Sequence, residues 1–262
     1  MQSKKVRFIT AFAAVACLLW LFGLGWTVND YLFGTNGASA FPVSDEEPAP
    51  ASDEFKIIAL GDSLTRGIGD LEGKGYAGYV SDRLKQAGWN ISFVNLGIKG
   101  LTSVQLAEQM KEMEIGRQIG QADAVLMTIG GNDLFLGGQT LSNLTDEGIA
   151  KLEDEYLNHL EVILGAIQAS NPDAAVYVLG LYDPFGELEE GAVTSRVVRA
   201  WNYKTMETIA EYANAVFVPT YDLFQQNVSE YLFTDQFHPN EKGYQRMAER
   251  VAALIIGTGG QS

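Results

Sequence analysis

Short apolar runs alternate with longer amphipathic stretches from residue 55 onward, and this alternation limits the possible folds more than any other feature. A short apolar run indicates a strand buried on both faces, whereas apolar residues at three- and four-residue steps indicate one face of a helix. Repeated strand and helix units build a parallel sheet with helices on both faces. We therefore predict an α/β chain with strands at residues 56–60, 91–95, 124–129, 175–181 and 215–219.

Two helices between and after these strands have recognisable limits. Apolar residues recur at helical spacing from Ile149 to Ile167, behind an acidic helix start at 145–147, and Asn171-Pro172 should end this helix. The last helix is predicted to begin near Asn240. Ligands of open parallel sheets bind at the carboxyl ends of the strands, so we expect the functional site in the loops that follow them.

The N-terminal segment is predicted to anchor the chain in a membrane. Lys4, Lys5 and Arg7 precede an apolar segment without a charge before Asp30. Such a segment is long enough to span a bilayer, and the basic residues favour a cytoplasmic N-terminus. Residues 1–30 are therefore expected to be a membrane anchor or signal segment, with the rest of the chain outside the cytoplasmic membrane.

Cleavage of the anchor is the alternative, because Ala38-Ser39-Ala40 fits a small-x-small cleavage site and would release a secreted protein. The distance of this site from the apolar segment favours an uncleaved anchor. Residues 31–54 combine proline with many acids and are predicted to be an extended linker. A catalytic domain at 55–257 and a flexible tail at 258–262 complete the predicted organisation.

Charge and cysteine content exclude some functions. The formal net charge of -15 repels phosphate backbones, so nucleic acid is not an expected partner. Cys17 is the single cysteine and lies in the N-terminal apolar segment, so an exported domain must fold without internal disulfides.

Three residues at predicted strand ends have the chemistry of acyl transfer. Ser63 follows the first strand and could attack a carbonyl carbon if a base removes its proton. His238 is the candidate base, and Asp235, three residues earlier, could orient its imidazole. The other histidine, His159, lies within an amphipathic helix and is predicted to be structural.

An ester hydrolase also needs donors for the oxyanion that forms during attack. Gly97 could offer a backbone N–H and Asn132 a side-chain amide, although a turn glycine and a helix cap are the alternative roles. Their position at the same predicted sheet edge favours the functional role. Asp62 and Asp133 are instead assigned to capping or loop bracing.

The chain resembles the SGNH hydrolases, also called the GDSL lipase/esterase family. The matching motifs are GDSLT at 61–65, NLG at 95–97, GGND at 130–133 and DQFHPN at 235–240. The resemblance extends over residues 55–256, and the ordered set of motifs is far more specific than any one of them. It implies a flavodoxin-like three-layer α/β/α sandwich with a five-stranded parallel sheet.

The resemblance also implies a role for each site residue. Ser63 would be the nucleophile and would donate its N–H to the oxyanion hole, which Gly97 and Asn132 would complete. Asp235 and His238 would complete the catalytic triad. No metal or cofactor is implied.

We therefore expect a serine-dependent ester hydrolase that acts outside the membrane on a small-molecule, lipid or other acyl ester. A deacetylase of O-acetylated cell-wall or other sugars and a non-catalytic surface binding module are the alternatives. A metal-dependent phosphoesterase is disfavoured, because such a centre needs more histidine and carboxylate ligands. Loop residues Leu101, Phe135, Leu136 and Phe185 could hold an acyl chain or serve only to pack the loops.

Overall fold

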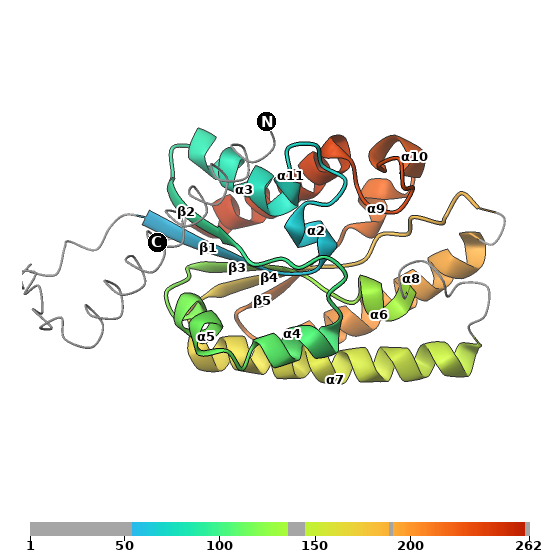
Figure 1. Ribbon diagram of the computed structural model, residues 1–262, viewed down its shortest axis with the longest axis horizontal. Coiled ribbons are helices and arrows are strands. Elements are labelled where there is room, and N and C mark those ends of the chain that lie inside the picture. The colour runs from blue at the N-terminus through green and yellow to red at the C-terminus, as the bar shows by residue number, and fades with distance from the viewer. Residues whose placement is uncertain (1–53, 136–144, 189–190, 260–262) are drawn as a thin grey trace, which may run out of the picture. The chain divides into compact units, whose positions relative to one another are not determined.

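A parallel sheet between two helical layers forms the centre of the part that the structure, a computed structural model, describes: residues 54–135, 145–188 and 191–259 (Figure 1). Within these residues the sheet has five strands in the order β2-β1-β3-β4-β5, and all neighbours are parallel. This order is flavodoxin-like and confirms the predicted α/β fold. The strands are β1 Glu54–Gly61, β2 Asn90–Asn95, β3 Ala124–Thr128, β4 Ala175–Leu179 and β5 Ala215–Val218.

Helices cover both faces of the sheet (Figure 1). On one face α11 packs against α3, α9 and α10, and on the other face α7 packs against α4, α5 and α8. The helices are α2 Ser63–Arg66, α3 Gly75–Gln86, α4 Ser103–Gln109, α5 Met113–Ile119, α6 Gly131–Phe135, α7 Asp146–Ser170, α8 Gly191–Ile209, α9 Tyr221–Phe224, α10 Val228–Tyr231 and α11 Glu241–Gly259.

The interior strand β1 is apolar throughout its middle because both of its faces are covered. Ile58 and Leu60 pack into the core on the α7 side, whereas Ile57 and Ala59 pack into the core on the α11 side. Successive strand side chains point to opposite faces, so a strand in this position needs a continuous apolar run rather than an alternating one.

The long helix α7 begins and ends as the sequence predicts. The Thr145 hydroxyl accepts a hydrogen bond from the Gly148 N–H at 3.1 Å, which caps the first turn. The helix ends at Ser170, because Pro172 cannot continue it and Asn171 has extended backbone angles.

Strands β4 and β5 are shorter than the sequence predicts. β4 ends at Leu179 because the backbone of Leu181 bonds to the side chain of Asn202 instead of to a strand. The Leu181 N–H donates to Asn202 Oδ1 at 2.7 Å, and its carbonyl accepts from Asn202 Nδ2 at 2.7 Å. β5 ends at Val218, and Pro219 has no N–H to continue the ladder.

The predicted anchor at 1–30 and the linker, apart from Glu54 at the start of β1, lie outside the described residues and stay predictions. At the other end, α11 reaches Gly259, beyond the predicted domain end at 257. Glycines lower helix stability without forbidding the helix, which accounts for this difference. Among the residues described, none of the helices combines the length and apolar character that crossing a membrane requires.

The chain changes direction along the sheet at β1. From β1 it crosses to β2 on one side, and it then returns to the other side of β1 to form β3. The crevice beyond the carboxyl ends of two such strands is the usual ligand site of this topology. Ser63 follows β1 and Asn132 follows β3, so both lie at this crevice.

Candidate active site

Ser63 lies where β1 turns sharply into α2. Gly61 has a φ of +122°, and a Cβ there would be 1.9 Å from the carbonyl oxygen of Thr128, so this position requires glycine. Asp62 caps α2, because its carboxylate accepts a hydrogen bond from the Leu64 N–H at 3.0 Å. Ser63 is the first residue of α2, and its own N–H has no acceptor among the residues that the structure describes.

A buried group of hydroxyls holds this turn against β3. The Thr128 hydroxyl donates to Asp62 Oδ1 at 2.7 Å and lies 2.8 Å from the Thr65 hydroxyl. The Thr65 hydroxyl in turn lies 2.9 Å from the carbonyl oxygen of Leu60. These contacts join the end of β1, the end of β3 and α2, so the orientation of Ser63 is fixed from three elements.

His238 reaches Ser63 from the loop before α11. Its Nε2 lies 2.9 Å from Ser63 Oγ, and its Nδ1 lies 2.7 Å from Asp235 Oδ2. The backbone of this loop is also held, because the His238 carbonyl accepts from the Phe233 N–H at 2.8 Å. A Cβ on Gly69 would be 2.4 Å from the Pro239 carbonyl oxygen, so glycine lets the α2–α3 loop pack against the histidine loop.

Asp235 orients both the ring and the backbone of His238. Its Oδ1 accepts hydrogen bonds from the N–H groups of Phe237 at 3.1 Å and His238 at 3.0 Å. Partial burial raises the pKa of this carboxyl, but the hydrogen bonds from the His238 ring and from the two N–H groups outweigh burial and lower the pKa below its ordinary value. Gln236 has a φ of +55° in this turn, an uncommon conformation for a residue other than glycine.

Asn132 is the second residue of α6, at the end of β3. Its Nδ2 donates one hydrogen bond to the carbonyl oxygen of Leu101 at 2.9 Å. An amide nitrogen carries two hydrogens, so one remains for a ligand. The bond to Leu101 also places the loop between β2 and α4 beside Asn132.

Gly97 was predicted to donate its N–H to an oxyanion, but this N–H has another acceptor. It donates to Asn95 Oδ1 at 2.9 Å, while Asn95 Nδ2 donates to the Thr65 carbonyl at 2.7 Å. A Cβ on Gly97 would be 2.5 Å from the Arg66 nitrogen. In this structure Gly97 therefore attaches its loop to α2, and its role as an oxyanion donor stays a prediction.

Gly100, in the same loop, was not singled out from the sequence. It has a φ of +77°, no atom would lie within 4 Å of a Cβ placed on it, and its N–H has no acceptor within the described part of the chain. It directly precedes Leu101, whose carbonyl binds Asn132. Gly100 is exposed, so its N–H is open to water, whereas the Gly97 N–H is already bonded.

Asp133, next to Asn132, braces the β2–α4 loop as the sequence predicts. Its two carboxylate oxygens each lie 3.0 Å from the Ser103 nitrogen, and the Ser103 hydroxyl donates to Asp133 Oδ1 at 2.5 Å. His159 on α7 is half-buried, and its Nδ1 lies 3.1 Å from Ser103 Oγ. The two predicted structural residues thus meet at one buried serine, separate from the contact between Ser63 and His238.

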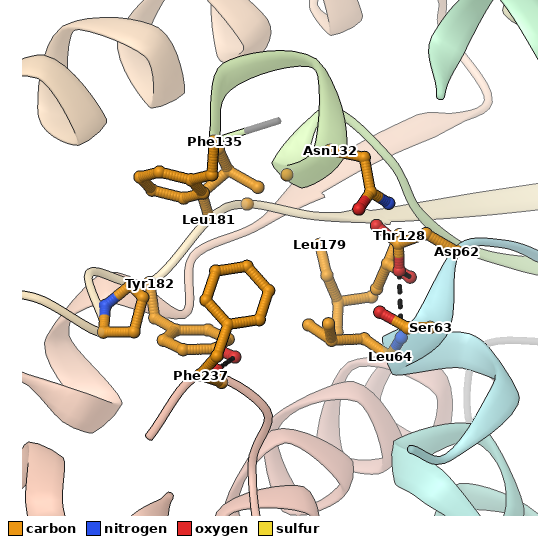
Figure 2. A pocket seen from close by; sticks show the side chains of 13 residues that line it. Asp62, Ser63, Leu64, Thr128, Asn132, Phe135, Leu179, Leu181, Tyr182 and Phe237 are labelled. Atoms are coloured by element: carbon orange, nitrogen blue, oxygen red, sulfur yellow. Dashed lines mark hydrogen bonds between the residues drawn. The ribbon is translucent and has the colours of Figure 1, made fainter. Parts of the chain in front are cut away.

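A pocket that is open to solvent lies between Ser63 and a group of apolar side chains. Figure 2 shows Ser63, Asp62 and Asn132 on one side of it and the rings of Phe135, Tyr182 and Phe237 on the other. The polar side contains the candidate nucleophile and amide donor, and the apolar side offers no hydrogen-bonding side chain except the Tyr182 hydroxyl, which donates to the Phe237 carbonyl.

Comparison with known proteins identifies the family of the chain. Residues 59–246 match the model of the GDSL-like lipase/acylhydrolase family. The Bacillus subtilis protein YpmR, which is uncharacterized, is 36% identical over 205 residues, covering 76% of this chain and 80% of YpmR. The spore germination lipase LipC of Bacillus licheniformis is 26% identical over 210 residues, covering 78% of this chain and 97% of LipC.

A solved structure has the same fold. The lipase Lip_vut3 from a goat rumen metagenome superposes with a TM-score of 0.69 at 24% identity, covering 76% of this chain and 96% of that lipase. Sheet order and strand-end residues define an α/β ester hydrolase. The chain belongs to the GDSL-like lipase/acylhydrolase family.

Replacing Ser103 by alanine should destabilise the protein. Ser103→Ala removes a buried hydroxyl that donates to Asp133, so we expect the free energy of unfolding to fall by about 1–3 kcal/mol. Ser81→Ala is the matched control, because the Ser81 hydroxyl is also buried but has no partner among the described residues, and its removal should cost nothing. Urea unfolding of both variants checks this, and equal losses would contradict it.

Asp62 should make stability depend on pH. Burial raises the pKa of Asp62 from 3.8 to about 6, so the folded state holds this proton more tightly than the unfolded state. As the pH rises from about 4 to about 6, the carboxyl ionises in the unfolded state while the folded state still holds its proton, so this group's contribution to the free energy of unfolding falls by about 3 kcal/mol and levels off above about pH 6.

Asp62→Asn removes this titration while keeping an acceptor oxygen. Urea unfolding between pH 4 and pH 7 should therefore show a smaller loss of stability in the variant than in the wild type. Parallel pH profiles for the two proteins would refute the role given to Asp62.

Proposed function

We propose that this ester hydrolase uses Ser63 as its nucleophile, His238 as general base and Asp235 as the group that orients His238. The main support is one continuous hydrogen-bonded line, with 2.9 Å between Ser63 Oγ and His238 Nε2 and 2.7 Å between His238 Nδ1 and Asp235 Oδ2. The low pKa of Asp235 keeps its carboxylate ionised, which favours the Nδ1–H tautomer and leaves Nε2 free to accept a proton.

The reaction then follows from these positions. Ser63 Oγ bonds to the carbonyl carbon of the ester while its proton moves to His238 Nε2. The tetrahedral intermediate collapses, the ester C–O bond breaks, and His238 gives the proton to the leaving alcohol oxygen. A water molecule, deprotonated by His238, attacks the acyl-serine; as the acyl–Oγ bond breaks and the acid leaves, His238 gives this proton to Ser63 Oγ, which restores the serine hydroxyl.

The oxyanion needs donors that already point to where the negative charge develops. The free N–H of Ser63 and the second amide hydrogen of Asn132 are the two we propose first. For the third donor we propose Gly97, which is buried against α2; its N–H donates to Asn95 Oδ1 at 2.9 Å in this structure and would exchange that acceptor for the oxyanion.

A crystal structure with a boronate bound to Ser63 tests this assignment, because the boronate oxygen occupies the oxyanion position. We expect this oxygen to accept hydrogen bonds from the Ser63 and Gly97 N–H groups and from Asn132, with the contact between Gly97 and Asn95 broken. A Gly97 N–H still bonded to Asn95 beside the bound boronate would remove Gly97 from the oxyanion hole.

Removing the nucleophile should abolish turnover. In Ser63→Ala, hydrolysis of p-nitrophenyl acetate by the full chain should fall by at least about 10³-fold, because the covalent step has no attacking oxygen. Ser170→Ala, at the exposed end of α7, is the control and should retain the wild-type rate. Retained activity in Ser63→Ala, with unfolding curves that match the wild type, would rule out the mechanism.

Loss of the amide donor should affect kcat more than KM. Asn132→Ala removes a contact made to the oxyanion, which exists only in the transition state and intermediate, so kcat should fall on the order of 10²-fold or more while KM changes little. Asn158→Ala, on the exposed face of α7, is the control. An unchanged kcat in Asn132→Ala would remove this residue from the oxyanion hole.

A further inference from the structure

His159 on α7 lies outside the proposed triad, but hydrogen bonds connect it to the residue beside the oxyanion donor Asn132. Its Nδ1 lies 3.1 Å from Ser103 Oγ, and the Ser103 hydroxyl donates to Asp133 Oδ1 at 2.5 Å. A hydroxyl has one hydrogen, which Asp133 accepts, so the His159 ring must donate to Ser103. The connection therefore runs from α7 through the first residue of α4 to the residue that follows Asn132 in α6.

Helix α6, which contains Asn132, depends on its neighbours for its orientation. It has five residues, too few for a helix to be stable alone. Two contacts attach it to the β2–α4 loop and the start of α4. The Asn132 amide donates to the Leu101 carbonyl at 2.9 Å, and the Ser103 N–H donates to the Asp133 carboxylate at 3.0 Å. A movement of Ser103 would therefore be transmitted to α6 and to the Asn132 amide.

The long helix α7 is the fixed side of this attachment. Its residues Tyr156, Leu160 and Ile163 are buried in the core between the sheet and the helices. Tyr156 precedes His159 by three residues, so the two side chains are neighbours on the helix surface. A Cβ on Gly130, just before α6, would be 2.7 Å from the Tyr156 ring, so glycine lets the start of α6 pack against α7. α7 thus contacts the start of α6 through Tyr156 and the start of α4 through His159.

The Ser103 hydroxyl needs both of its partners to hold one direction. Ser103 is fully buried, so water has little access to replace a lost bond. Burial raises the pKa of Asp133, and the bonds from Ser103 and the nearby His159 only partly offset this rise. Bonds to His159 and Asp133 together fix the rotation of the Ser103 side chain, whereas a bond to Asp133 alone would leave it freer to turn.

We infer that His159 is a positioning residue for the reaction, because its hydrogen bond to Ser103 fixes, through Asp133, the direction of the oxyanion donor Asn132. The inference rests on the proposed function, since it requires that the Asn132 amide donates to the oxyanion. Loss of the bond would leave the donor in place but less well directed, and a small displacement of a catalytic group lowers the rate.

The test compares two polar substitutions at His159 in the full chain. In His159→Asn the amide nitrogen can take the place of Nδ1 and donate to Ser103, whereas the longer side chain of His159→Gln carries its nitrogen past this position. We expect kcat for p-nitrophenyl acetate to fall about 10-fold in His159→Gln with KM little changed, and to stay near the wild-type value in His159→Asn. Glutamine is the better helix former, so a purely structural role would favour His159→Gln instead.

A second comparison shows whether His159 acts through Asn132. In an Asn132→Ala background, adding His159→Gln should leave kcat unchanged, because the donor that His159 positions is already absent. His159→Ala removes the whole ring and should behave as His159→Gln does in both backgrounds, so the result does not depend on the folding of one variant. Asn158→Ala, next to His159 on the exposed face of α7, is the control and should leave kcat unchanged in both.

The outcomes separate this inference from the mechanism. Wild-type kcat in folded His159→Gln, or equal losses in His159→Gln and His159→Asn, would overturn the positioning role and leave the serine mechanism intact. An equal loss from His159→Gln with and without Asn132 would also overturn it, since the effect would not pass through Asn132. Wild-type kcat in Asn132→Ala, or retained hydrolysis in Ser63→Ala, would instead overturn the proposed function, and the positioning role with it.

Discussion

The buried contacts among Asp62, Thr65 and Thr128 hold together the part of the molecule on which the site depends. They join β1 and β3 at their carboxyl ends and fix the first turn of α2, where Ser63 lies. A serine hydroxyl is useful as a nucleophile only when its direction is set before substrate arrives, because correct orientation removes a large entropic barrier. Gly61 makes this arrangement possible by letting the turn approach the Thr128 carbonyl closely.

The partners of Ser63 come from segments far away in the chain, and each is attached to the central turn separately. The histidine loop packs on Gly69, and the Tyr244 hydroxyl on α11 donates to the Ile68 carbonyl at 2.6 Å. The loop after β2 is joined to α2 by Asn95 and to α6 by Asn132 and Asp133. The site is therefore built from loops that are individually braced against the same few residues of the first strand and turn.

Much of this could be predicted from the sequence because it depends on local patterns. Apolar runs show where strands end, and a parallel sheet brings those ends to one edge, so Ser63, Asn132 and His238 could be assigned to one site. The end of β4 and the acceptor of the Gly97 N–H could not be predicted. Both depend on which side chain, Asn202 or Asn95, takes a particular backbone hydrogen bond, and such long-range contacts leave no periodic signal. The contacts of Phe135 and Phe185 with Phe237 were missed for the same reason, because they are purely tertiary.

The attachment of Ser63 and the lining of the cavity come from different parts of the chain. Residues of β1, α2 and β3 hold Ser63, whereas Phe135, Leu181 and Pro184 come from α6 and from the loop after β4. Substitutions in the second group can accumulate without touching the hydroxyls that align Ser63. Related proteins, or engineered variants, can therefore differ in the shape of the pocket beside Ser63 while the contacts that hold Ser63 stay the same.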